Sequence, residues 1–83
     1  MDQNAIYRDL REFIVRECLE GEGSGLDADT PLLEWGVLNS ITMHMLNNHI
    51  AERFSVEVPF DKRTPQNFAT LRQITTLVES LQK

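Results

Sequence analysis

Ser40 is the residue whose type and position best suit covalent chemistry. It follows the glycine-containing stretch Leu32–Asn39 and opens a run of apolar residues at helical spacing, so it is expected in the first turn of a helix. There its hydroxyl lies beside unpaired backbone N–H groups and the positive end of the helix dipole, a favourable place for a phosphate ester. A serine at this position can also act only as a helix cap.

Two histidines and one cysteine offer other chemistry. His44 follows Ser40 by four residues on the same helical face, the spacing of a nucleophile and its base, but no acid or oxyanion-binding group accompanies the pair. We therefore expect no catalytic site. His44 and His49 are five residues apart, a poor spacing for a shared metal, so no metal site is expected. Cys18, near two glutamates, is expected to be a small core residue and not a reactive thiol.

Length and composition bound the class of protein. Eighty-three residues, 41% hydrophobic and 25% charged, predict a single small folded domain spanning 1–83, with too little interior for a deep pocket. The net charge of −5 opposes binding to nucleic acid or anionic membranes, and no apolar run is long enough to cross a bilayer. A single cysteine allows no internal disulfide, which favours a cytoplasmic location. We expect a monomer.

The apolar spacing predicts an all-α fold, a small four-helix bundle with three longer helices and one short one. The first helix covers 5–19 after a cap at Asn4, and a long loop connects it to the second helix at 40–54. A short helix begins at Thr64-Pro65 and is anchored by Phe68, and Thr70 caps a final helix that reaches the C-terminus. The glycine-rich segment 21–25 is expected to be flexible, whereas the leucines and valine at 26–38 are expected to pack on the core.

This arrangement resembles the acyl and peptidyl carrier protein family. The family's motif is Asp-Ser-Leu at the start of the second helix, often after Leu-Leu-Glu-Ser-Gly-Leu-Leu, and it corresponds here to Leu32-Leu33-Glu34-Trp35-Gly36-Val37-Leu38-Asn39-Ser40-Ile41. A second stretch, Ile50-Ala51-Glu52-Arg53-Phe54-Ser55-Val56-Glu57-Val58-Pro59, is similar to the family's Leu-Glu-Glu-x-Phe-x-Val-x-Ile-Pro. The resemblance covers essentially the whole chain.

The resemblance implies a free-standing carrier that is not an enzyme. A phosphopantetheinyl transferase would move the 4′-phosphopantetheine of coenzyme A onto Ser40, whose new thiol would hold an acyl or aminoacyl group as a thioester. Further implied partners are an adenylating or acyl-transferring loading enzyme and downstream tailoring or condensing enzymes. The pathway implied is a secondary-metabolite one, of polyketide or nonribosomal peptide type, with a separate adenylating enzyme for loading. The alternative is an unmodified helical adaptor that binds partners through its second helix.

The second helix departs from the family pattern in its charge. Asn39 replaces the common aspartate and keeps its capping ability, and Glu52 is the only carboxylate at 40–54. Family analogy implies partner contact through a neutral set, for which packing and hydrogen bonds would matter more than charge. Met45 fits a core stripe equally well. Trp35 either covers the loop or contacts the arm and its cargo. The partner-facing set comprises Asn39, Ile41, Thr42, His44, Met45 and Asn48.

Overall fold

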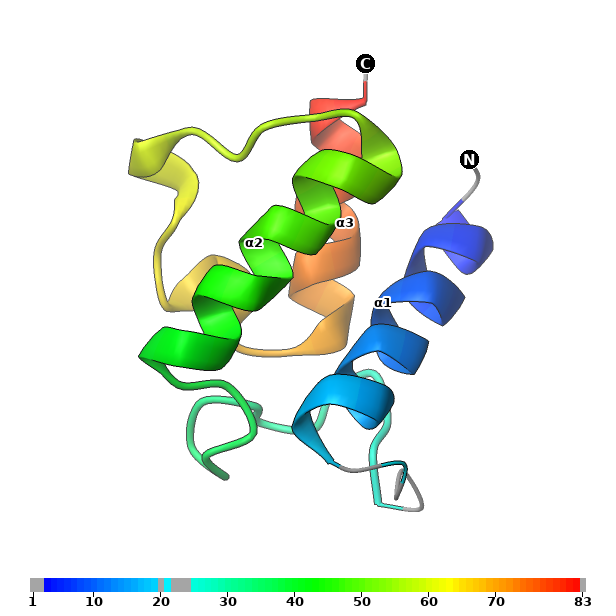
Figure 1. Cartoon of the computed structure of the whole chain (residues 1–83), viewed down its shortest axis with the longest axis vertical. Helices are drawn as coiled ribbons and strands as arrows, with labels where there is room; N and C mark the ends of the chain where they lie inside the picture. The colour runs from blue at the N-terminus through cyan, green and yellow to red at the C-terminus, as the bar shows by residue number, and fades with distance from the viewer. Residues whose placement is uncertain (1–2, 20, 22–24, 83) are drawn as a thin grey trace.

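Three α-helices form the body of the protein in the computed structural model, which describes residues 3–19, 21 and 25–82. They are α1 (Gln3–Cys18), α2 (Ser40–Phe54) and α3 (Leu71–Leu81), with two 3₁₀ turns, η1 (Phe60–Lys62) and η2 (Gln66–Phe68), between α2 and α3. In Figure 1, α2 crosses in front of α3, α1 lies to one side, and the long connection from α1 to α2 closes one end. The described residues contain no strand, so the predicted all-α class is confirmed.

The short helix of the predicted four-helix bundle is a single 3₁₀ turn, η2, and η1 was not predicted. Thr64 does help to begin η2, because its hydroxyl accepts a hydrogen bond from the Asn67 N–H at 3.3 Å. The turn cannot lengthen because Thr70 is extended, with φ −140° and ψ 162°, in order to accept the Gln73 N–H as the cap of α3. The prediction of Thr70 as a cap is thus confirmed, and its conformation ends the preceding turn.

Both ends of α1 differ from the prediction. Asn4 lies inside the helix, which already includes Gln3, so its assignment as the cap was wrong. At the other end Gly21 has φ +88°, a left-handed conformation that favours glycine, and its N–H donates to the Val15 carbonyl at 2.8 Å. The same carbonyl also accepts the Leu19 N–H at 3.3 Å, so two hydrogen bonds tie the chain after α1 to its last turn. The predicted flexibility of segment 21–25 concerns mainly residues 22–24, which lie outside the described residues.

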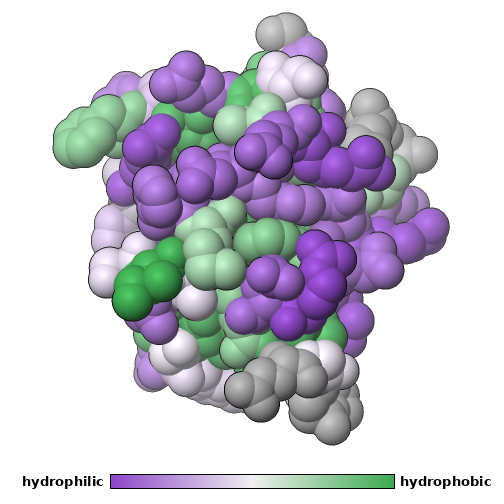
Figure 2. Space-filling view, in the orientation of Figure 1, coloured by the Kyte–Doolittle hydropathy of each residue, from purple (hydrophilic) through white to green (hydrophobic). Residues whose placement is uncertain are grey.

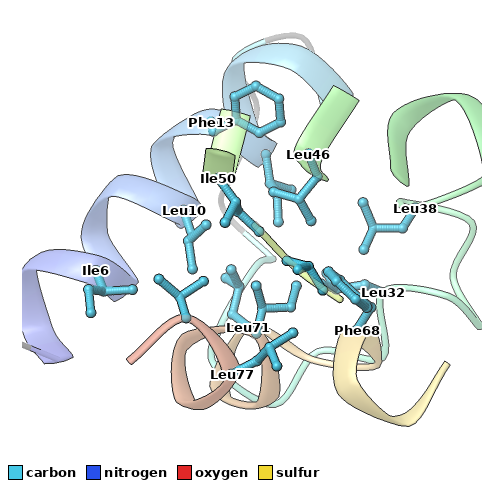
Figure 3. Close-up of a cluster of buried hydrophobic side chains, with 14 of the residues drawn as sticks. Ile6, Leu10, Phe13, Leu32, Leu38, Leu46, Ile50, Phe68, Leu71 and Leu77 are labelled. Atoms are coloured by element: carbon cyan, nitrogen blue, oxygen red, sulfur yellow. The ribbon is translucent and has the colours of Figure 1, made fainter. Parts of the chain in front are cut away.

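The core is one cluster to which every helix and the long loop contribute (Figure 3). Its α1 residues repeat at three and four positions, as predicted, and the same spacing appears on α2 and α3. Leu26, Leu32 and Leu38 show that the α1–α2 connection packs on the core as expected. The buried hydrophobic side chains of the α-helices are Ile6, Leu10, Phe13 and Ile14 of α1, Leu46, Ile50 and Phe54 of α2, and Leu71, Ile74, Leu77 and Val78 of α3.

A polar cluster joins α1 to α2 at the edge of this core. The Asp9 carboxylate accepts hydrogen bonds from His49 Nε2 and Arg53 Nε, both at 2.6 Å. The His49 ring also stacks on Phe13 with centroids 4.3 Å apart and meets Phe54 edge-on at 6.4 Å. Burial raises the pKa of Asp9, but the hydrogen bonds and positive charges of Arg53 and His49 outweigh it and hold the pKa below its ordinary value.

We predict that Asp9→Asn lowers the free energy of unfolding by about 1–2 kcal/mol at neutral pH, because the carboxylate is largely shielded from solvent. A carboxyl whose pKa is lowered by folding contributes its full stabilisation above the unfolded value, about 3.9, and loses it as pH falls through the folded value. The difference between wild type and variant should therefore vanish in acid. Urea unfolding at several pH values measures it, with exposed Asp61→Asn as control. An equal loss in both variants at neutral pH would contradict the prediction.

Candidate functional site

Ser40 is the first residue of α2, and its side chain is exposed. The residue before it, Asn39, is the cap: its backbone is extended, and its Oδ1 accepts the N–H groups of Ile41 at 2.9 Å and Thr42 at 3.0 Å. Thr42 Oγ1 in turn accepts the Asn39 N–H at 2.8 Å, which completes a capping box. Asn39 and not Ser40 is therefore the cap, so the alternative of Ser40 as the helix cap was wrong, whereas both predicted ends of the second helix are confirmed.

The loop that delivers Ser40 is fixed from two sides. Leu38, 2% exposed, enters the core directly before Asn39. Further back, the Leu32 N–H donates to the Ala69 carbonyl at 2.8 Å, which ties the loop to the start of α3. Gly36 adopts φ +75° between these two anchors, a conformation that a side chain would strain. The position of Ser40 is thus set by contacts with the core and not by α2 alone.

The Ser40 hydroxyl has no hydrogen-bond partner among the residues that the structure describes. His44, proposed from its spacing as a possible base, has its Nε2 3.4 Å from the Asn48 Nδ2 instead. The described residues also hold no group of three or more metal-ligating side chains. His44 and His49 face different ways, since His49 turns to Asp9 of α1. The arrangement presents an accessible hydroxyl and does not activate it as a nucleophile.

The electrostatic surroundings suit an anion on this hydroxyl. The first turn of α2 contains no acidic residue. A phosphate ester at Ser40 would lie at the positive end of a fifteen-residue helix without a neighbouring carboxylate in that turn. Asn39 contributes to this balance, because it caps the helix as an aspartate would but adds no negative charge.

Around Ser40 the surface is neutral and partly apolar, and Figure 2 shows hydrophobic atoms gathered over the first half of α2. Ile41 is 71% exposed, and Asn39, His44 and Asn48 are exposed as well. Thr42 and Met45 are half-buried: the hydroxyl of Thr42 is engaged in the capping box, and Met45 packs against the core. The six residues expected to face partners therefore divide into four exposed ones, of which Asn39 also caps α2, and two half-buried ones with structural contacts.

Trp35 and Cys18 were the remaining candidates near the site. The Trp35 side chain is 63% exposed, so it covers little of the core, yet it borders an open pocket of about 110 Å³ together with Leu26 and Val37. Cys18 is half-buried on α1. Burial and the charge of Glu17 raise the pKa of its thiol, against a smaller opposing effect of a hydrogen bond with Thr42. A raised pKa disfavours the thiolate, as expected for an unreactive cysteine.

Sequence reasoning missed one polar residue on α2. Asn47 donates through Nδ2 to the Met43 carbonyl at 3.0 Å, while its buried Oδ1 has no hydrogen-bond partner in the described structure. A signal was present in the sequence: Asn47 lies seven residues after Ser40, beside the apolar stripe of Met43, Leu46 and Ile50. An amide at the margin of such a stripe is partly enclosed.

Comparisons with known proteins place this geometry in a family. No protein-family model matches the sequence. PigG of Serratia sp. (strain ATCC 39006), a probable acyl carrier protein, is 32% identical over 72 residues, which cover 87% of this chain and 83% of PigG. The chain belongs to the acyl carrier protein family. Proteins of this family carry intermediates and do not catalyse their conversion, so this chain is a carrier and not an enzyme.

A solved structure agrees with the assignment of the fold. A chain in the crystal structure of an FAD-dependent dehydrogenase superposes with a TM-score of 0.79 and 36% sequence identity, over 84% of this chain and 99% of the other. The carrier's described helices include none long and apolar enough to cross a membrane.

We predict that Asn39→Ala lowers the free energy of unfolding by about 1 kcal/mol, because the N–H groups of Ile41 and Thr42 lose their acceptor. Amide hydrogen exchange at these two residues should accelerate. Asn39→Asp should retain both properties, since a carboxylate caps equally well. Asn48→Ala, an exposed asparagine on the same helix, serves as the control. Equal exchange rates in Asn39→Ala and wild type would show that the capping box does not hold the end of α2.

Proposed function

We propose that the chain holds acyl or aminoacyl intermediates as thioesters on a 4′-phosphopantetheine arm attached to Ser40. The observation that carries this proposal is the exposed, unpartnered Ser40 hydroxyl at the capped N-terminus of α2, in a member of the acyl carrier protein family. The residues present fit the group: a helix N-terminus receives its phosphate, and no acid in the first turn opposes it.

Attachment requires a transferase and coenzyme A. The Ser40 oxygen would attack the phosphorus that bears the pantetheine, the bond to the second phosphate would break, and 3′,5′-ADP would leave. The hydroxyl proton would pass to a base of the transferase, because the carrier has no hydrogen-bonded base at Ser40 among its described residues. When bound, the arm supplies a thiol that forms the thioester. The chain's own contribution is to hold one hydroxyl in a fixed and accessible position.

The finer role that we propose is that of a free-standing carrier in a secondary-metabolite pathway, loaded by a separate adenylating enzyme. The Leu32–Leu38 stretch supports this, through its similarity to carriers loaded in that way. Likeness to a chain in the crystal structure of an FAD-dependent dehydrogenase supports a redox enzyme among the tailoring partners. Such an enzyme would move a hydride from the cargo to its flavin and a proton to a base, so natively loaded protein should contain species that differ in mass by two hydrogens.

Transient partners are proposed to contact the exposed neutral surface beside Ser40. Ile41 is its apolar centre, with Asn39, His44 and Asn48 around it. A small apolar centre within a polar rim is the usual composition of such an interface. Glu52, the only acid of α2, lies near the far end of the helix, so charge attraction contributes little close to the modified serine.

We predict that coexpression with a broad-specificity phosphopantetheinyl transferase adds one phosphopantetheinyl group, measured by intact-protein mass. The addition should be absent in Ser40→Ala, since the attacking oxygen is gone, and present in the control Ser80→Ala. Asn39→Asp should be modified like wild type. An unchanged wild-type mass would reject the carrier function and favour the alternative, an unmodified adaptor that binds through α2.

We predict that Ile41→Ser lowers the kcat/KM of the transferase about fivefold to tenfold, because the partner then buries less apolar surface. The variant's own stability should change by less than about 0.5 kcal/mol, since the side chain is exposed. Phe60→Ser is the matched control: Phe60 is 88% exposed but belongs to η1, away from the proposed contact surface. Equal losses in the two variants would place the contact surface elsewhere.

A further inference from the structure

Asn47 has the one buried amide oxygen without a hydrogen-bond partner among the described residues. Its orientation is fixed by the other half of the same group, because the Met43 carbonyl accepts from Nδ2 at 3.0 Å and could not accept from an oxygen. Rotating the amide would replace one unsatisfied atom by two. The unpaired Asn47 Oδ1 therefore does not result from a wrongly oriented amide.

An unsatisfied buried acceptor destabilises the folded protein, so native structures contain few of them. Each such group needs an explanation, such as a catalytic role or a bound water or ion. Nothing in the fold itself requires an amide here, since an apolar side chain of the same size would extend the stripe of Met43, Leu46 and Ile50. The oxygen of Asn47 therefore points to a donor supplied from outside the chain.

The position of Asn47 on α2 relates it to Ser40. Ser40, Met43 and Asn47 are spaced by three and four residues and so lie along one edge of the helix. A different edge of α2 faces α1. That edge carries His49 and Arg53, which bind Asp9 of α1. In Figure 1, α1 lies on one side of α2 and the segment after α2 passes on the other. The Ser40–Asn47 edge is thus free of the contacts that bind α2 to α1.

We propose that Asn47 Oδ1 accepts a hydrogen bond from an amide N–H of the phosphopantetheine arm on Ser40, which lays the arm along this edge of α2. The inference rests on the proposed function and adds a docking position for the arm. The arm contains two amide groups, and its N–H donors are of the kind that the Asn47 oxygen lacks. Docked in this way, the arm would be a positioned group and not a freely swinging one.

The reach of the arm agrees with the position. Seven residues of helix separate Ser40 from Asn47, a rise of about 10 Å. Seven bonds join the Ser40 oxygen to the first amide nitrogen of the arm, roughly 9 Å when extended, and four more bonds lead to the second, roughly 14 Å. The first amide can reach Asn47 only if the arm is nearly extended, whereas the second can reach it with the arm partly folded.

Access requires a small rearrangement, because Oδ1 is buried in the structure. Met43 lies between Ser40 and Asn47 on the same edge and is only half-buried. Methionine has three rotatable bonds and adapts readily, so a change of its rotamer can open the amide to the arm. The backbone of α2 need not move.

The test uses holo protein whose arm carries ¹⁵N in both amides, made from labelled coenzyme A. In wild type, one arm amide should exchange its proton with solvent about fivefold to tenfold more slowly than in free pantetheine and show NOEs to Asn47. The exchange should return to the free rate in Asn47→Leu and stay slow in Gln73→Ala, a control that removes an exposed amide from α3. Urea unfolding adds a second measure: modification should raise the unfolding midpoint of wild type and not that of Asn47→Leu.

Each outcome separates the two proposals. Mass spectrometry first establishes whether Ser40 is modified, and a failure at that step rejects the proposed function itself. If Ser40 is modified but both arm amides of wild type exchange at the free rate, the carrier function stands and the docking position is wrong. Slow exchange that persists in Asn47→Leu would likewise overturn the assignment to Asn47. Should Asn47→Leu not fold, Asn47→Ala takes its place in the same comparison.

Discussion

The seating of the α1–α2 connection on the core is the constraint on which the site depends. Leu32 and Leu38 are buried, and the Leu32 N–H is bonded to the Ala69 carbonyl, so the chain reaches Asn39 in one conformation. Only then can Asn39 present its side chain to the N–H groups of Ile41 and Thr42. A capping box worth about 1 kcal/mol would not by itself fix the connection 19–39. The core holds the loop, and the loop places the serine.

Besides the face that buries Leu46, Ile50 and Phe54 in the core, α2 has three sides with separate surroundings. One edge is bound to α1 through Asp9, His49 and Arg53. The exposed face presents Ile41 in neutral surroundings, and the remaining edge runs from Ser40 to Asn47. Because α1 restrains only the first of these, the proposed contacts with an enzyme and with the arm would leave the bundle intact. On these proposals one short helix would serve both the bundle and its partners.

Local patterns predicted α2 from the sequence, and tertiary contacts account for what they missed. Ser40–Phe54 and the cap at Asn39 follow from residue types within a few positions of each other. The Asp9–His49 pair joins residues forty apart, and no spacing rule can identify it. Thr42 was expected to face partners by family analogy, but its hydroxyl takes part in the capping box. The predicted short third helix is only a 3₁₀ turn, because Thr70 is extended in order to cap α3 and cannot also continue a helix.

The distribution of charge then bears on how partners recognise this carrier. Nine of its thirteen acids precede Asn39, whereas α2 contains only Glu52. An attractive field from α1 and the loop can still speed the encounter with a basic partner over a Debye length of about 8 Å at physiological salt. At the serine itself the surface is neutral, so specificity at the proposed interface would come from shape and from apolar contact around Ile41. An arm held along the Ser40–Asn47 edge would add to that shape, since a partner would meet helix and arm as one surface.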